Sequence, residues 1–353
     1  MLRLIAVAIV ILTATPLGAQ WLKQPTAGLP RTADGKPNLS APAPRTADGK
    51  PDLSGLWRFN AGPYGGNIAA DLKSADIQPW AEALYKQRFE DLGKDDPSTY
   101  KCLPQGPKAI IGLGWAKIIQ TPTLIAVLFE DLSYRQIFLD GRELPKDPNP
   151  SFMGYSVGHW EGDTLVVEST GFNDRTWLDG GGHPHSEALR ITERFRRKDF
   201  GHIELKETFD DPKVYARPWT IDVGVDLVTD TELLEYVCNE NEKDHQHLVG
   251  KASDDKKLAV KVAPQVLSKY VGTYEFRPPD DPSFVMLFGV TLSGDELSMD
   301  VAGKDKQPMI PLSETTFSVV GGRLDFVKDD RGAVTHLIFH AVEGDFKGVR
   351  KPK

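Results

Sequence analysis

Residues 156–170 read SVGHWEGDTLVVEST, two β-prone runs joined by a short polar segment. Glu161, Gly162 and Asp163 have the composition of a hairpin turn, because glycine and aspartate tolerate the backbone angles of such turns. The flanking runs are short and rich in β-branched and aromatic residues, as strands are. This segment therefore predicts an antiparallel hairpin.

The same pattern extends outward from the hairpin, from Trp115 to Val237. Short runs with alternating or β-branched residues are separated by turn residues, and no helical periodicity lies between them. The predicted strands are 117–120, 124–129, 134–139, 156–160, 165–170, 189–196, 202–209, 220–227 and 233–237. Nine strands without intervening helices favour an antiparallel barrel or a strongly curved sheet over a parallel sheet.

One helix is predicted before these strands, over residues 79–92. Pro79 suits the first turn of a helix, and Trp80, Leu84, Tyr85 and Leu92 fall near one helical stripe. The fold class is therefore mainly β, with one packed helix.

A charged stretch, 239–263, interrupts the strand pattern and predicts a linker. After it, residues 264–353 are again strand-rich and predict a smaller C-terminal β-barrel domain. Its predicted strands are 272–276, 285–292, 296–301, 309–312, 316–320, 323–327 and 334–340. The larger β domain then spans residues 55–238.

Residues 20–54 precede the first domain and contain a tandem repeat. Residues 30–40 read PRTADGKPNLS and residues 44–54 read PRTADGKPDLS. The segment is rich in proline and poor in large apolar side chains, so it predicts a linker or an arm that follows the edge of the domain.

Residues 1–19 have the pattern of a secretory signal peptide. Arg3 precedes an apolar run, which is followed by Pro16, Gly18 and Ala19. The run is shorter than the roughly 20 residues that cross a bilayer, so cleavage is favoured over an uncleaved anchor. We therefore expect a periplasmic or secreted protein with no membrane span after signal cleavage.

An oxidising compartment would let Cys102 and Cys238 form a disulfide; the alternative is two buried thiols. The chain has 353 residues, with 42 basic and 50 acidic side chains and a net charge of −8. This charge lacks the basic footprint of a nucleic-acid-binding protein. Nothing in the sequence specifies an oligomeric state.

Two resemblances to known families add to the predicted export and β-rich fold. The motifs TADGKPDLSGLW (46–57), WEGDTLVVE (160–168) and TGFNDRTWLDGGGHPHSEAL (170–189) resemble a family of secreted bacterial proteins of unassigned activity. That resemblance implies export and a β-rich fold, but no chemistry. LSKYVGTYE (267–275), PLSETTF (311–317) and LDFVKD (324–329) look like the small lipocalin-like β-barrel appended to serine β-lactamase-like proteins. This second resemblance implies an accessory module with no known catalytic residues.

Residues 172–187, FNDRTWLDGGGHPHSE, form the most concentrated polar segment. In an extended conformation His183, His185 and Glu187 would share a side, which predicts a divalent metal site. Alternatively, His183 or His185 would act as an acid or base with Asp179 or Glu187. In the third interpretation these groups are structural, with the glycines supplying positive φ angles.

The predicted ligand-binding residues are Asn173, Asp174 and Trp177, together with Arg194 and Arg217. Arg135 and Arg142 join the arginines that would clamp an acidic ligand if they point inward. Two weaker patterns are the GYSVG motif around Ser156, which lacks the helix of a nucleophile elbow, and the His245/His247 pair.

The first functional hypothesis is an exported soluble protein that binds a small, partly apolar ligand in its barrel or in a sheet cleft. The alternative is a hydrolase or lyase that uses the His183, His185, Asp179 and Glu187 loop, with or without a divalent metal. A second alternative is an envelope-associated interaction protein that uses its repeats as the contact.

Overall fold

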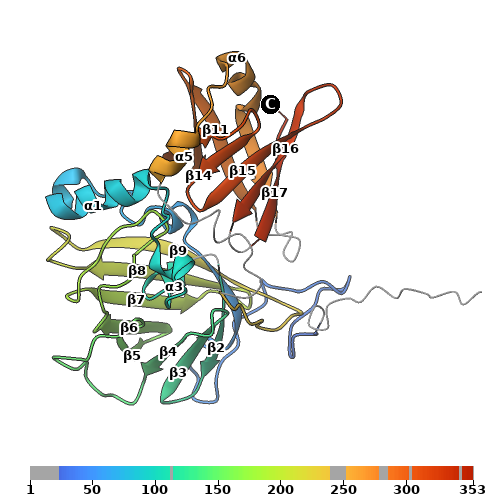
Figure 1. The fold of residues 1–353 in the computed structure, drawn as a ribbon. Coiled ribbons are helices and arrows are strands. Elements are labelled where there is room, and N and C mark those ends of the chain that lie inside the picture. Colours follow the sequence, from blue (N-terminus) through green and yellow to red (C-terminus); the bar gives the residue numbers. More distant parts are fainter. Residues whose placement is uncertain are drawn as a thin grey trace, which may run out of the picture.

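The computed structural model describes residues 24–111, 114–238, 252–277, 285–301, 304–341 and 344–352. These residues form two closed β-barrels, so the predicted mainly β fold is confirmed. Figure 1 shows the first barrel in green and yellow, and the second in orange and red beside α1. No helix in the described ranges has the length and hydropathy needed to cross a bilayer. The signal pattern at 1–19 lies outside the described residues.

The first barrel alternates buried and exposed residues along its strands, most regularly in the final strand. Its strands are β1 (Gly55–Asn60), β2 (Trp115–Gln120), β3 (Leu124–Phe129), β4 (Tyr134–Phe138), β5 (Tyr155–Glu161), β6 (Thr164–Thr170), β7 (Arg190–Arg197), β8 (His202–Asp210) and β9 (Trp219–Leu227). The predicted strand at 233–237 is wrong, and β1 is a strand in its place. The physical reason is closure: β1 pairs with both β2 and β9, so β9 has no free edge for a further strand.

The nine strands follow one another around the barrel in chain order. Strands that strictly alternate in direction close a ring only when their number is even. With nine strands, one neighbouring pair must be parallel, and that pair is β4 and β5. The purely antiparallel prediction therefore fails at this pair, which a long connection, 139–154, joins.

The second barrel has eight strands among the described residues, and all of its pairs are antiparallel. The strands are β10 (Gly272–Phe276), β11 (Met286–Ser293), β12 (Glu296–Val301), β13 (Lys304–Pro311), β14 (Thr316–Val319), β15 (Gly322–Lys328), β16 (Val334–Ala341) and β17 (Gly344–Arg350). The sequence does not predict the closing strand β17, and β13 begins five residues before its predicted start.

Helix α1 (Pro79–Glu90) confirms the predicted helix, but the expected apolar stripe is wrong at Trp80, which is 51% exposed. Ala81 is the residue of α1 that is fully buried. The remaining described helices and 3-10 turns are short: α2 (Pro97–Tyr100), α3 (Lys108–Ile111), α5 (Ala252–Leu258), α6 (Pro264–Leu267), η1 (Gly62–Gly65), η2 (Ser74–Asp76) and η3 (Ser268–Tyr270).

The two repeats fold into the same turn. In the first, Thr32 N–H donates to the Lys36 carbonyl; in the second, Thr46 N–H donates to that of Lys50, both at 2.9 Å. Each copy also ion-pairs with the first barrel: Arg31 binds Asp230 at 2.7 Å, and Arg45 binds Asp163 at 2.6 Å. Of the two predicted alternatives, a linker or an arm, the repeat segment is therefore an arm that is attached to the first barrel. Figure 1 shows it in blue.

The two barrels touch through the end of α1 and the segment that joins the domains. Leu92 and Ile310 pack together in a small buried cluster. Asp255 of α5 is ion-paired with Lys94 and accepts a hydrogen bond from the Ser318 hydroxyl at 2.7 Å. Helix α5 thus gives the second half of the predicted linker a defined position against both domains.

Candidate functional site

The polar loop 172–187 connects β6 to β7 and packs against the segment that contains α1. Asp179 lies at its centre and is completely buried. Its carboxylate accepts hydrogen bonds from the backbone N–H groups of Ile68, Gly182 and His183, at 2.7 to 3.0 Å. Burial alone would raise the pKa of Asp179, but the contact with His183 and these donors hold it below its usual value.

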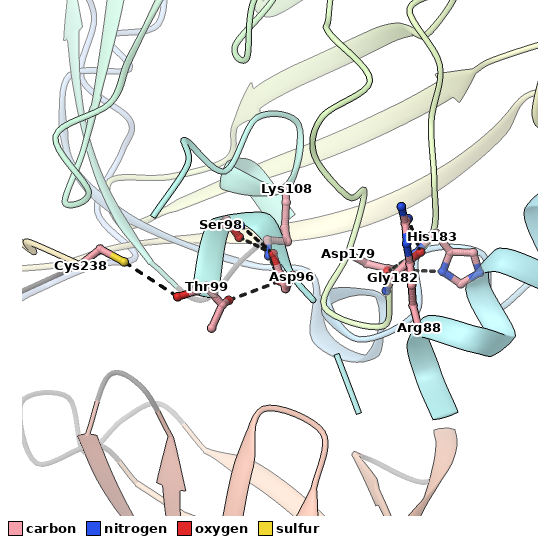
Figure 2. Close-up of polar contacts among 9 residues, drawn as sticks. All are labelled: Arg88, Asp96, Ser98, Thr99, Lys108, Asp179, Gly182, His183 and Cys238. Carbon is pink, nitrogen blue, oxygen red and sulfur yellow. Dashed lines mark hydrogen bonds and ion pairs between the residues drawn. The ribbon is translucent and has the colours of Figure 1, made fainter. Parts of the chain in front are cut away.

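His183 completes this arrangement. Its Nδ1 lies 2.6 Å from Asp179 Oδ2, and its ring stacks on the ring of Tyr85, with centroids 3.7 Å apart. Figure 2 shows the pair beside α1, which supplies Arg88. The structure therefore brings together Asp179 and His183, the acid and base that the sequence proposed, but the imidazole is only 2% exposed.

Two of the three glycines in this loop allow its close approach to α1 and to the segment before that helix. A Cβ atom on Gly181 would lie 2.4 Å from the Gly66 carbonyl oxygen, and one on Gly182 would lie 2.7 Å from Arg88 Cβ. Gly182 also has a φ of +102°, which disfavours other residues. Arg88 then donates to the Gly182 carbonyl at 2.9 Å and lies over the Trp177 ring.

His185 and Glu187 do not join Asp179 and His183. His185 is buried, and its Nε2 lies 2.9 Å from the Thr176 hydroxyl. Burial lowers the pKa of His185. Glu187 is exposed. Within the described residues, no group of three His, Cys, Asp or Glu side chains is arranged to hold a metal ion, so the predicted set of ligands is not assembled.

The predicted ligand-binding residues are dispersed. Trp177 is buried under Arg88, Asn173 is half-buried, and Asp174 is exposed at the surface. Arg194 and Arg217 are exposed and form ion pairs with Glu161 and Asp76.

The weaker candidates also differ from expectation. Ser156 lies within β5 and is buried inside the barrel, so it does not form a nucleophile elbow. Arg142 points outward and pairs with Asp140. His245 and His247 lie outside the described residues.

An open cleft lies next to the Asp179–His183 pair, between α1 and β13 of the second barrel. It has a volume of about 340 Å³ and is lined by Tyr85, Lys86, Phe89, Glu90 and Lys306. Tyr85 thus lines the cleft and also stacks on His183. No local sequence pattern indicates this cleft, because its walls come from α1 and from β13 of the second barrel.

A second group of polar residues lies inside the first barrel. Arg135 of β4 points inward, unlike Arg142, Arg194 and Arg217, and donates to both carboxylate oxygens of Glu193 on β7. It also donates to the hydroxyls of Ser156 and Ser169. Glu207 of β8 lies directly opposite Glu193 in the strand register. Both glutamates are completely buried.

Sequence reasoning missed Glu193 and Glu207, although a signal was present. Each stands at an inward position between apolar residues two positions away: Ile191 and Phe195 flank Glu193, and Leu205 and Phe209 flank Glu207. A charged residue in the apolar phase of a strand is the pattern of a buried polar site.

One end of the interior is covered by residues 102–111, which we call the cap segment. Lys108 of the cap segment is ion-paired with buried Asp96 at 2.5 Å (Figure 2). Cys102 forms the predicted disulfide with Cys238. Both ends of the cap segment are therefore fixed to other parts of the chain.

No protein-family model matches the chain, and a search of curated proteins gives no match. The resemblances to a secreted family and to a lipocalin-like module thus stay predictions.

Proposed function

We propose that the protein is an exported binder of a small, partly apolar ligand, which it holds in the cleft between α1 and β13. The observation that carries this proposal is the cleft itself, because its volume of about 340 Å³ falls in the usual size range of small-molecule sites. The signal pattern at 1–19 and the Cys102–Cys238 disulfide support export to a periplasmic or secreted location.

The lining residues indicate the chemistry of the ligand. Tyr85 and Phe89 lie one helical turn apart on α1 and offer aromatic surface. Lys306 supplies positive charge from β13, Lys86 is ion-paired with Glu82 on α1 at 2.9 Å, and Glu90 supplies one negative charge. A flat apolar molecule with an acidic group satisfies both features: its ring packs on the aromatic side chains and its acid pairs with a lysine.

Binding of the fluorescent probe 8-anilinonaphthalene-1-sulfonate tests this proposal, because the probe is aromatic and anionic. We expect Tyr85→Ala and Lys306→Glu each to weaken binding about tenfold, which corresponds to about 1.4 kcal/mol. Trp80→Ala, on an exposed part of the same helix, is the control and should bind as the parent does. Equal affinity for all four proteins would refute the cleft as the site.

The alternative, a hydrolase or lyase, is supported by one observation, the contact between Asp179 and His183. A carboxylate that holds Nδ1 orients the imidazole so that Nε2 is the nitrogen that exchanges a proton with a substrate. Tyr85 covers one face of this ring, so catalysis would require Tyr85 to move. Hydrolysis of a panel of nitrophenyl esters by the parent and by His183→Gln tests this alternative; equal rates would exclude His183 as a catalytic residue for esters.

A further inference from the structure

The interior of the first barrel contains one more acid than base around its cavity. The charged residues that line this cavity are Arg135, Glu193 and Glu207. Arg135 and Glu193 form a bidentate pair and neutralise each other. Glu207 is therefore left without a counter-charge.

Glu207 is also left without hydrogen bonds. Its side chain is completely buried, and neither carboxylate oxygen has a hydrogen-bond partner among the described residues. A buried polar group in this state costs free energy, and such groups are uncommon in folded proteins. An unsatisfied carboxyl group that faces a cavity is most simply explained by a missing partner.

The cavity in front of Glu207 limits the size of that partner. The cavity has a volume of about 10 Å³, which is room for about one water molecule or a group of similar size. The other lining residues are Gly106, Pro107 and Ile110 of the cap segment, with Met153, Phe172 and Ile191. These side chains are apolar, so they offer a ligand no competing hydrogen bonds.

We propose that this cavity binds the ammonium ion through the carboxylate of Glu207. Charge supports this choice: a monocation beside ionised Glu207 makes the buried cluster neutral, whereas an anion would leave it with two uncompensated negative charges. Hydrogen bonding supports it too, because each of the two Glu207 oxygens can accept an N–H hydrogen bond from the ammonium ion.

A proton competes with the ligand for Glu207. Burial raises the pKa of Glu207 well above its usual value, and the negative charge of Glu193 raises it further, while Arg135 acts in the opposite direction. Without a cation Glu207 therefore holds its proton. Binding of the ammonium ion releases that proton, so affinity rises with pH until Glu207 ionises by itself.

The first test compares thermal unfolding in ammonium chloride and in sodium chloride at equal ionic strength, at about pH 6 and about pH 8. We expect ammonium to raise the unfolding midpoint more than sodium does, with saturation at high concentration and a larger shift at the higher pH. Glu207→Gln should lose the ammonium-specific shift. Glu204→Gln, an exposed position on the same strand, should keep it.

The second test uses the parent chain alone and so does not depend on the folding of a variant. Nitrogen-15-labelled ammonium is added, and nuclear magnetic resonance follows a bound signal whose protons exchange slowly with water. Unlabelled ammonium should displace this signal, whereas tetramethylammonium, which is larger than the cavity and has no N–H donors, should not. An absent bound signal together with identical ammonium and sodium shifts would mean that the cavity holds only water, and would overturn the proposal.

Both tests are independent of the cleft between the barrels. Tyr85→Ala should retain the ammonium effect, and Glu207→Gln should retain binding of the fluorescent probe. A failure of either site is therefore distinguishable from a failure of the other.

Discussion

Asp179 is the residue on which the loop 172–187 most depends. Its carboxylate accepts bonds from Ile68, Gly182 and His183, so it joins the loop to the segment before α1. We expect Asp179→Ala to lower the free energy of unfolding by about 3–5 kcal/mol, because the buried donors would lose their acceptor. Urea denaturation measures this loss. The control, Asp174→Ala, is exposed and should change stability by less than about 0.5 kcal/mol.

Glu207 gives the stability of the protein a pH dependence. The folded state holds the proton of Glu207 because its pKa is raised, while the unfolded chain releases it near the usual value of 4.5. Stability is therefore lost as pH rises from that value through the folded-state pKa, by about 1.4 kcal/mol for each pH unit in that range. Relative to the parent, Glu207→Gln should become progressively more stable from about pH 5 to about pH 8 in urea denaturation. A difference that stays constant with pH would contradict this.

At single positions, sequence reasoning located the pair Asp179 and His183 but not its environment. The loop was recognisable because its polar residues and glycines are adjacent in the chain. The contact with Tyr85 joins positions that are about a hundred residues apart, so no local pattern reports it. Arg135 was one of several candidate arginines, and only its inward position in β4 distinguishes it.

Among the elements, the strands with regular alternation were predicted almost to the residue, β3 and β10 with their observed bounds. The two strands missed, β1 and β17, are the ones that close the barrels, at opposite ends of their domains. The sequence GDFKGVR of β17 has two glycines and three charged residues, so its strand propensity is weak. Pairing with β10 and β16 stabilises it instead.

The cap segment is the element whose position depends on a covalent bond. Cys102 and Cys238 are 136 positions apart, and closing a loop of this length stabilises the folded state by about 4–5 kcal/mol through the entropy of the unfolded chain. The double variant Cys102→Ser, Cys238→Ser should show a loss of this size in urea. The parent protein treated with reductant should show the same loss, whereas the double variant should not respond to reductant.

On the scale of the whole molecule, the two barrels should unfold together. Asp255 contacts Lys94 of the first domain and Ser318 of the second, so its loss leaves a buried lysine without its partner. We expect Asp255→Asn to split the heat-capacity peak of the parent into two transitions in calorimetry. Asp254→Asn, an exposed neighbour, is the control and should keep a single peak. Two peaks in the parent would show that the junction does not couple the domains.

The presence of two β-rich units was predictable from the sequence, but the junction between the barrels was not. The change from strands to a charged segment after residue 238 marks a boundary, because such composition cannot form a core. The contact of Leu92 with Ile310 depends on how two finished barrels meet, and neither barrel alone requires it.

The parallel pair β4 and β5 decides which loops share a rim of the first barrel. The pairs from β1 through β9, β8 and β7 to β6 are all antiparallel, so β6 runs in the same direction as β1. The connections that follow these two strands, 61–114 and 171–189, therefore leave from the same rim of the barrel. If β5 were antiparallel to β4, as in a barrel with an even number of strands, the 171–189 connection would leave from the opposite rim. It would then lie a full strand length away from α1. The odd number of strands therefore places the 171–189 connection on the same rim as the connection that contains α1. On that rim His183 stacks on Tyr85.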